Sequence, residues 1–277
     1  MTFEAAPPAE PDRADPIGQG LRRSPDKQGQ NRGLSPVLLA GADLWRSFGK
    51  TEVLKGVSIT IAPGEIVALM GPSGSGKSTI LHLLAGLLKP DRGSVLMEGQ
   101  RIDELSEKRR SELRLKHCGL VFQFGDLIPE LTLGENVELP LRLTGVKAGL
   151  ARRHARDYLG RLGVADQADR LVQEVSGGQA QRAAVARALV HSPKVILADG
   201  PTGSLDTVTG ELVLEAFVAA ARDQGSAVLL VTHEPRVAAW ASREVLLWDG
   251  RILGSSPPAI DHMHDAVPAP GAPWPAS

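Results

Sequence analysis

The sequence has little of what a secreted, membrane-spanning or nucleic-acid-binding protein needs. It contains one cysteine, Cys118, so no internal disulfide can form, which fits a reducing compartment. No stretch approaches the roughly 18 consecutive apolar residues that predict a membrane helix. The formal net charge is -1, so no overall basic field is present to attract nucleic acid. We therefore expect a protein without a membrane span of its own and without a nucleic-acid partner.

The two ends of the chain differ in composition from its middle. Residues 1–36 are rich in Pro, Gly, Gln and charged residues and lack the apolar segment of a secretory signal. Residues 255–277 are rich in Pro and Ala, and their segment 261–265 has metal-ligand residue types without a second ligand cluster, which favours a tail over a metal site. We predict disordered tails at both ends and one folded domain over residues 37–254.

The middle of the chain alternates strands, turns and helices. Residues 57–61 alternate apolar with polar or small side chains, which predicts a half-buried antiparallel strand, and residues 44–48 can supply its neighbour. The continuous apolar runs 66–70, 195–198 and 227–231 are typical of a parallel sheet that is covered on both faces. The predicted fold class is therefore α/β, with a parallel core and an antiparallel β subdomain.

Residues 102–175 have a different character from the rest of the domain. They show helical periodicity, many Arg and Glu residues and one short apolar run near Cys118, so we predict an inserted helical subdomain. Cys118 itself is interpreted as a small buried thiol in a strand. The arginine-rich run 152–156 suggests either an acidic or membrane-surface partner or a solvated helix face, and the alanines between the arginines favour the helix face.

The strongest chemical signal is a glycine-rich string, Gly71-Pro-Ser-Gly-Ser-Gly-Lys77-Ser78, which follows a buried strand and precedes an apolar helix. In this context its glycines allow consecutive backbone N–H groups to face phosphates, its lysine reaches the outer phosphates and its last serine ligates Mg²⁺. The string therefore predicts a nucleotide site. The residues assigned to phosphate binding are Gly71, Pro72, Ser73, Gly74, Ser75, Gly76, Lys77, Ser78 and Thr79.

A second string, residues 175–182, predicts another anion site in the same chain. Ser176 and two glycines precede a helical pattern, so the serine and the backbone N–H groups of the first turn can bind a phosphate at a helix N-terminus. An ordinary capped helix is the alternative, and the presence of the first string makes it the weaker one. The residues assigned to this second site are Ser176, Gly177, Gly178 and Gln179.

Together, the two strings resemble the ABC ATPase family, in which the second string contacts ATP held by the opposing cassette. The resemblance runs over residues 38–253. It implies a P-loop NTPase core with an antiparallel β subdomain and an inserted helical subdomain, and ATP and Mg²⁺ as ligands. It also implies a dimer of cassettes, made of identical or different chains, that is bound to an integral membrane permease at the cytoplasmic face of the cell membrane.

The resemblance assigns roles to further residues. Phe48 matches the aromatic residue that stacks on adenine, and Asp206 matches the loop that links the paired sites. Gln123 matches the glutamine that touches Mg²⁺ or the attacking water, and Asp199 matches the aspartate that holds Mg²⁺ through water. His233 matches the switch histidine near the γ-phosphate. Alone, Phe48 would be interpreted as a core aromatic and His233 as a surface residue. The implied metal ligands are Ser78, Gln123 and Asp199.

A narrower likeness lies in two segments, residues 126–141 and 201–206. They resemble the branch of the family that serves lipoprotein release, macrolide export and the cell-division cassette, whose partners are permeases with few helices. This branch implies an exporter or a lipoprotein-release complex. The ABC proteins of DNA repair, chromosome organisation and translation are disfavoured, because the chain has neither a long coiled coil between the two strings nor a second cassette.

One position departs from the family pattern. The residue after Asp199 is usually the glutamate that polarises the attacking water, and here it is Gly200. Because a positioned base contributes roughly 10²- to 10⁴-fold in rate, we expect slow hydrolysis with normal ATP binding. Three alternatives follow: a slow transport ATPase, a hydrolysis-deficient ATP-gated scaffold or regulator, and the degenerate half of a heterodimeric transporter.

Overall fold

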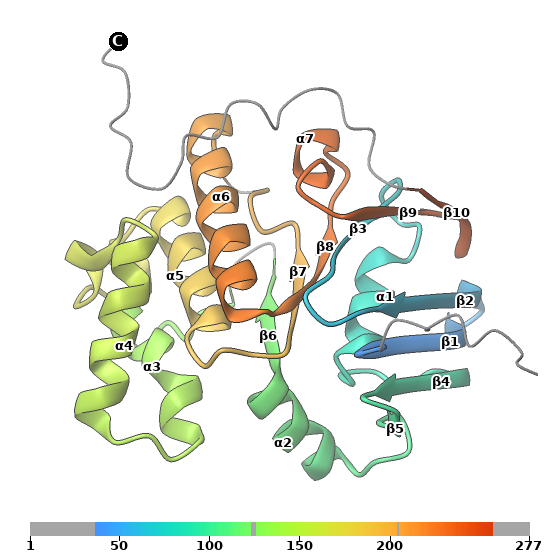
Figure 1. The fold of residues 1–277 in the computed structure, drawn as a ribbon, viewed down its shortest axis with the longest axis horizontal. Helices are drawn as coiled ribbons and strands as arrows, with labels where there is room; N and C mark the ends of the chain where they lie inside the picture. The colour runs from blue at the N-terminus through green and yellow to red at the C-terminus, as the bar shows by residue number, and fades with distance from the viewer. Residues whose placement is uncertain (1–36, 123–125, 204, 257–277) are drawn as a thin grey trace, which may run out of the picture. The chain divides into compact units, whose positions relative to one another are not determined.

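The computed structural model describes residues 37–122, 126–203 and 205–256. Within them, a six-stranded sheet, here called the large sheet, has the order β10-β9-β3-β8-β7-β6 (Figure 1). All its neighbouring strands run parallel except β10, which is antiparallel to β9. Its strands are β3 (Ile66–Met70), β6 (Cys118–Val121), β7 (Val195–Asp199), β8 (Ala227–Val231), β9 (Arg243–Trp248) and β10 (Arg251–Ser256). The three apolar runs predicted as parallel strands are β3, β7 and β8.

A second, antiparallel sheet has the order β2-β1-β4-β5. Leu44 pairs with Val57, as the alternating pattern of the two segments predicts. Its strands are β1 (Leu39–Phe48), β2 (Thr51–Ile61), β4 (Arg92–Met97) and β5 (Gln100–Arg101). The predicted antiparallel β subdomain is therefore present beside the parallel core.

Four of the described helices, α2, α3, α5 and α6, begin at a residue whose side chain caps them. Thr132 and Glu135 form a reciprocal capping box at the start of α3, and Gly225 ends α6 in a left-handed conformation. The helices are α1 (Lys77–Leu84), α2 (Glu107–His117), α3 (Leu133–Leu143), α4 (Ala148–Arg161), α5 (Gly177–Leu189), α6 (Thr207–Gln224) and α7 (Pro235–Ala238), with short 3₁₀ turns at Ala165–Gln167 and Val172–Glu174. Thus α2 to α4 supply the predicted helical insertion, and β6 joins the large sheet from within it.

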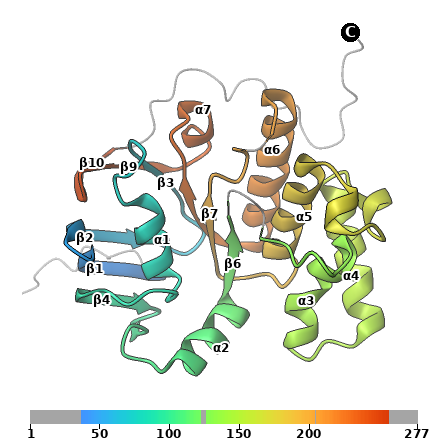
Figure 2. The same cartoon turned by 180° about the vertical axis from the view of Figure 1, so that it is seen from behind.

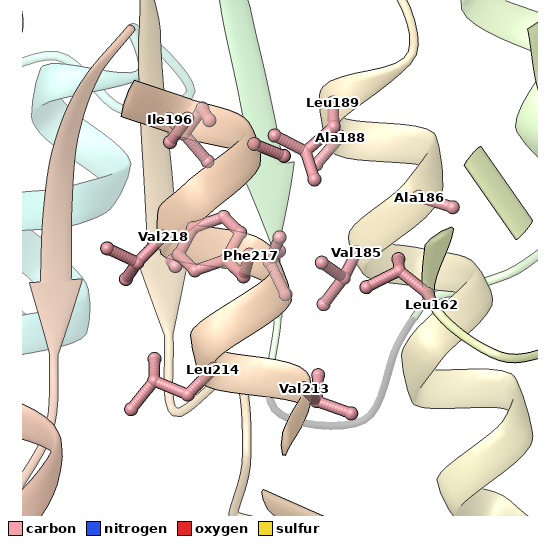
Figure 3. Close-up of a cluster of buried hydrophobic side chains, with 14 of the residues drawn as sticks. Leu162, Val185, Ala186, Ala188, Leu189, Ile196, Val213, Leu214, Phe217 and Val218 are labelled. Atoms are coloured by element: carbon pink, nitrogen blue, oxygen red, sulfur yellow. The ribbon is translucent and has the colours of Figure 1, made fainter. Parts of the chain in front are cut away.

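Two apolar cores lie on opposite faces of the large sheet. On one face, side chains of β3, β7 and β8 pack against α5 and α6, and Figure 3 shows Phe217 of α6 among Val185, Ile196 and Val218. On the other face, alternate residues of the same strands pack against α1 and the antiparallel sheet. Figure 2 shows α1 and the antiparallel strands from behind. Strands buried on both faces require continuous apolar runs, which is why these segments lack alternation.

Helix α4 has one buried and one solvated face. Ala151, Ala155 and Leu159 are buried, while the intervening arginines are exposed. Arg152 pairs with Glu138 at 3.4 Å, and Arg156 pairs with Asp169. This is the solvated helix face that the alanine spacing favours.

Cys118 is buried at the start of β6, as predicted. Burial raises the pKa of its thiol to about 12, so the thiolate that reactive cysteines need is disfavoured. Among the helices of the described ranges, none combines the length and apolar character required to cross a membrane.

Candidate functional site

Three strands of the large sheet end at one edge, and a predicted site residue follows or ends each of them. Val231, the last residue of β8, pairs with Leu69 of β3 on one side and with Asp199 of β7 on the other. The glycine-rich loop follows β3, Asp199 ends β7, and His233 lies two residues beyond β8. The sheet therefore places the loop, the aspartate and the histidine side by side. Ligands of open α/β sheets bind at this carboxyl edge.

The glycine-rich loop lies against the end of β9 and the turn that follows it. Gly71 has φ 149°, and a Cβ added there would lie 2.1 Å from the carbonyl oxygen of Leu247, so no other residue fits without a shift of the backbone. The backbone N–H of Gly250 donates to the carbonyl oxygen of Ser75 at 3.2 Å. These contacts fix the path of the loop, which a phosphate cradle of backbone N–H groups requires.

Lys77 opens α1 and reaches back across the loop. Its Nζ donates to the carbonyl oxygens of Gly71 at 2.8 Å and Pro72 at 2.7 Å. Burial lowers the pKa of this ammonium below the usual lysine value, and the charge of Asp199 opposes that shift. Ser78 is exposed and Thr79 is half-buried in the first turn of the same helix, whose N–H groups have no partner within the helix. A bound phosphate would meet a cation, a hydroxyl and free N–H groups here.

Gly200 follows Asp199 directly and has a left-handed backbone, with φ 54°. Its N–H donates to the carbonyl oxygen of Val231 at 2.9 Å, and its own carbonyl oxygen accepts from the N–H of Gly203 at 3.0 Å. Residues other than glycine adopt this conformation at a cost of roughly 1–2 kcal/mol. Position 200 therefore provides no carboxylate, and its backbone is one that favours glycine.

The segment that carries His233 is held by the backbone of its neighbours. The N–H of Thr232 donates to the carbonyl oxygen of Leu69 at 3.2 Å, and the hydroxyl of Thr232 accepts from the N–H of Glu234 at 3.0 Å. His233 is exposed between them. Its imidazole is consequently accessible beside the strand that leads into the glycine-rich loop.

The second predicted anion site is an exposed, capped helix N-terminus. Ser176 caps α5: its hydroxyl accepts from the N–H of Gln179 at 3.2 Å, and the Gln179 side chain accepts from the N–H of Ser176 at 2.8 Å. A Cβ added at Gly178 would lie 3.0 Å from the side chain of Leu205, so the first turn packs against the loop before α6. Asp206 caps α6, and the hydrogen bond from Thr209 lowers the pKa of its carboxyl.

Gln181 is a connecting residue that the motifs did not single out. It is buried on α5, and its side-chain amide donates to the carbonyl oxygens of Pro201 at 2.9 Å and Phe122 at 3.3 Å. It thereby ties the helix of the second site to the loop after Gly200 and to the end of β6. The signal in the sequence was a glutamine within an alanine-rich helical segment.

Phe48 and Gln123 complete the predicted set. Phe48 ends β1, and 47% of its surface is exposed, so it is not the core aromatic that it would be taken for alone. Gln123, together with Ser204 of the loop before α6, lies outside the described residues.

The donor types at the sheet edge fit Mg²⁺ bound with a nucleotide. The hydroxyl of Ser78 and the carboxylate of Asp199 are oxygen donors, which Mg²⁺ prefers. Among the residues that the structure describes, no three or more His, Cys, Asp and Glu side chains form a metal-binding group. The buried hydroxyl of Ser75, which has no hydrogen-bond partner in the described chain, is a further donor in the loop.

A glycine-rich loop between a buried parallel strand and a helix, at the carboxyl edge of an α/β sheet, defines a P-loop nucleotide-binding protein. A family profile described as "ABC transporter" matches residues 54–203. The chain belongs to the ABC transporter family.

Similar proteins cover almost the whole described domain. The lipoprotein-releasing system ATP-binding protein LolD of Geobacter metallireducens is 43% identical over 78% of this chain and 98% of its own. LolD 1 of Caulobacter vibrioides is 43% identical over 74% of this chain and 88% of its own. Dimeric MJ0796, a bacterial ABC transporter cassette, is 36% identical over 79% of this chain and 98% of its own, with a TM-score of 0.76. A dimeric post-hydrolysis state of MJ0796 bound to ADP and Pi gives 0.74 at 35% identity, with the same coverage. The predicted fold class is thereby confirmed.

Proposed function

We propose that this chain binds MgATP at Gly71–Ser78, works as a dimer of cassettes and couples ATP to a membrane permease. The observation that carries the proposal is the meeting of the glycine-rich loop, Asp199 and His233 at one edge of the large sheet. The dimeric cassettes among the similar structures, one of them bound to ADP and Pi, support the ligand and the assembly.

Different residues of the chain bind the phosphates and the Mg²⁺ ion. Lys77 and the first-turn N–H groups of α1 stabilise the phosphate charge, while Ser78, Asp199 and Gln123 hold Mg²⁺, which when bound neutralises charge on the phosphates. His233 contacts the outer phosphate from the end of β8. Because Gly200 has no carboxylate, no side chain at that position can take a proton from the attacking water. Hydrolysis is therefore slow unless another base acts.

The helix N-terminus at Ser176 completes the ATP site of a second cassette. If this holds, MgATP converts monomer to dimer, and Ser176→Arg prevents dimer formation because a long cation occupies the phosphate position and the cap is lost. Sedimentation velocity with and without MgATP measures the change. Ser192→Arg serves as the control, because Ser192 is exposed in the loop after α5 and the substitution adds the same charge away from the helix start. Dimerisation of Ser176→Arg equal to that of the wild type would contradict the shared site.

The membrane partner is a permease of the lipoprotein-release or export type. The similar LolD proteins are named for lipoprotein release, and the likeness of segments 126–141 and 201–206 to that branch supports the same kind of partner here. In this assembly the chain is peripheral at the cytoplasmic face of the membrane, and the permease contacts the transported substrate.

The helical insertion, α2 to α4, contacts the permease. A photoreactive residue in place of Glu130, which is exposed before α3, is therefore expected to cross-link to an integral membrane protein. The same probe in place of Glu215, exposed on α6, is the matched control and is expected to give none. Mass spectrometry of the cross-linked peptides identifies the partner. Cross-links from the probe at position 215 and none from the probe at position 130 would assign the contact elsewhere.

Gly200 favours a second candidate, in which ATP binding and dimerisation matter and turnover does not. The chain would then act as an ATP-gated regulator, or as the degenerate half of a heterodimer whose partner carries the glutamate. ATP turnover, measured with and without the partner permease, separates a slow transport ATPase from a regulator.

A further inference from the structure

The exposed ring of Phe48 is covered on one face by an arginine of the same strand. The guanidinium carbon of Arg46 lies 5.0 Å from the ring centroid, within the range of a cation–π contact. Because residues two apart on a strand share a face, both side chains project from the same face of β1. Phe48 is 47% exposed, so its side chain is still open to a flat ligand.

Arg46 is held in place by a network at the start of β4. Its Nη1 donates to Asp91 Oδ1 at 2.7 Å and to the carbonyl oxygen of Lys89 at 3.2 Å. The other carboxylate oxygen of Asp91 accepts from the N–H of Ser47 at 2.7 Å. Asp91 therefore fixes both the guanidinium and the backbone that leads into Phe48.

The Nε of Arg46 takes no part in this network. This nitrogen is buried and has no hydrogen-bond partner within the described ranges. A buried donor without a partner is unfavourable, so a position that leaves it unpaired needs another interaction to hold it. The contact with the Phe48 ring is such an interaction.

The same face of the antiparallel sheet lies beside the glycine-rich loop. Leu54 of β2 pairs with Arg46, and paired residues of neighbouring strands project from the same face. A Cβ added at Gly76 would lie 2.7 Å from the side chain of Leu54. The face of the antiparallel sheet that carries Arg46 and Leu54 is therefore the face that meets the loop proposed to hold the phosphates.

We propose that Arg46 is a positioning residue for the nucleobase, which it serves by fixing the Phe48 ring from one face and leaving the other face to stack on adenine. The proposal rests on the proposed ATP site. A ring that is already held loses less conformational freedom when the base binds, so affinity rises without a direct contact between Arg46 and the ligand.

Calorimetry of the full-length chain with two ligands tests this role. ATP carries the base, whereas tripolyphosphate occupies only the phosphate site. Arg46→Gln is expected to lower ATP affinity about two- to fivefold, the size of one exposed cation–π contact, and to leave tripolyphosphate affinity unchanged. Phe48→Ala is expected to lower ATP affinity further, again with no effect on tripolyphosphate. In the Phe48→Ala background, Arg46→Gln is expected to have no further effect.

Arg92 provides a matched control. Its guanidinium carbon lies 5.9 Å from the ring of Trp45, which projects from the opposite face of β1 to Arg46. Arg92→Gln removes the same kind of contact away from the loop and is expected to change the affinity of neither ligand.

Three outcomes would overturn the role of Arg46: ATP affinity unchanged in Arg46→Gln, an equal loss for ATP and tripolyphosphate, or an equal effect of Arg46→Gln with and without Phe48. Failure of the ATP site itself has a different signature, because the wild-type chain would then bind neither ligand, or Lys77→Ala would bind both as the wild type does.

Discussion

Lys77→Ala is expected to lower ATP affinity on the order of 10- to 100-fold, the range for losing hydrogen bonds to charged groups. The Nζ of Lys77 lies within the loop, with its ammonium on the carbonyl oxygens of Gly71 and Pro72. Those carbonyls belong to the loop and not to the core, so the melting temperature is expected to change little. Isothermal titration calorimetry with MgATP measures the affinity, and circular dichroism reports the fold.

Lys194→Ala is the matched control for the lost charge. Lys194 pairs with Glu98 at 2.7 Å and directly precedes β7, so it lies at the opposite end of that strand from Asp199. It is expected to bind ATP as the wild type does. Equal affinities of wild type and Lys77→Ala would remove the glycine-rich loop from the nucleotide site.

Gly200→Glu is expected to raise the ATPase rate by something approaching 10²-fold, the lower end of the range for a positioned base. ATP affinity should change little, because position 200 makes no phosphate contact in the proposed site. The left-handed backbone at this residue adds a cost of roughly 1–2 kcal/mol. That cost corresponds to a melting temperature lower by about 2–8 °C. Phosphate release and thermal unfolding measure the two effects separately.

Gly200→Gln separates the carboxylate from the backbone. It has the same backbone cost and a side chain of similar size that cannot act as a base. Its melting temperature is therefore expected to equal that of Gly200→Glu, and its ATPase rate that of the wild type. Rapid hydrolysis by the wild-type chain that disappears in Lys77→Ala would contradict the inactivating role of Gly200 and point to another base, such as His233.

A heterodimer makes a different prediction for the wild-type chain. Mixed with a glutamate-bearing partner, it would supply an intact Ser176 helix to the partner's ATP, so the mixture would turn over rapidly and Ser176→Arg would abolish that turnover. A chain that acts as a slow homodimer gives no such increase on mixing.

The sequence predicted the parallel core because buried strands leave a direct signal. Segments 66–70, 195–198 and 227–231 are continuously apolar, since both of their faces are covered, and they form β3, β7 and β8. The glycine-rich string was equally direct, because the close approach of Leu247 to Gly71 excludes a side chain. In these segments, the residue types that the folded environment requires are also the ones that give a clear local sequence pattern.

Other features arise only when distant segments meet. The bonds of Gln181 join α5 to Phe122 and Pro201, and those of Arg46 join β1 to Asp91, across sequence separations that no local pattern encodes. The positive φ of Gly200 is similar, because the bond from its N–H to Val231 depends on the pairing of β7 with β8. The family motif showed from the sequence alone that position 200 lacks a carboxylate. The backbone conformation of Gly200 could be seen only in the folded structure.

Affinity purification of the full-length chain from detergent-solubilised membranes, with mass spectrometry of what co-elutes, tests most directly whether this is the ATP-binding subunit of a transport complex. We expect a permease with several membrane spans in a stoichiometric amount. Lys77→Ala is expected to retain it, because Lys77 lies in the nucleotide site and not in the helical insertion. A chain that is recovered from membranes without any multi-span protein, under detergent conditions that preserve a known ABC complex, would contradict this role.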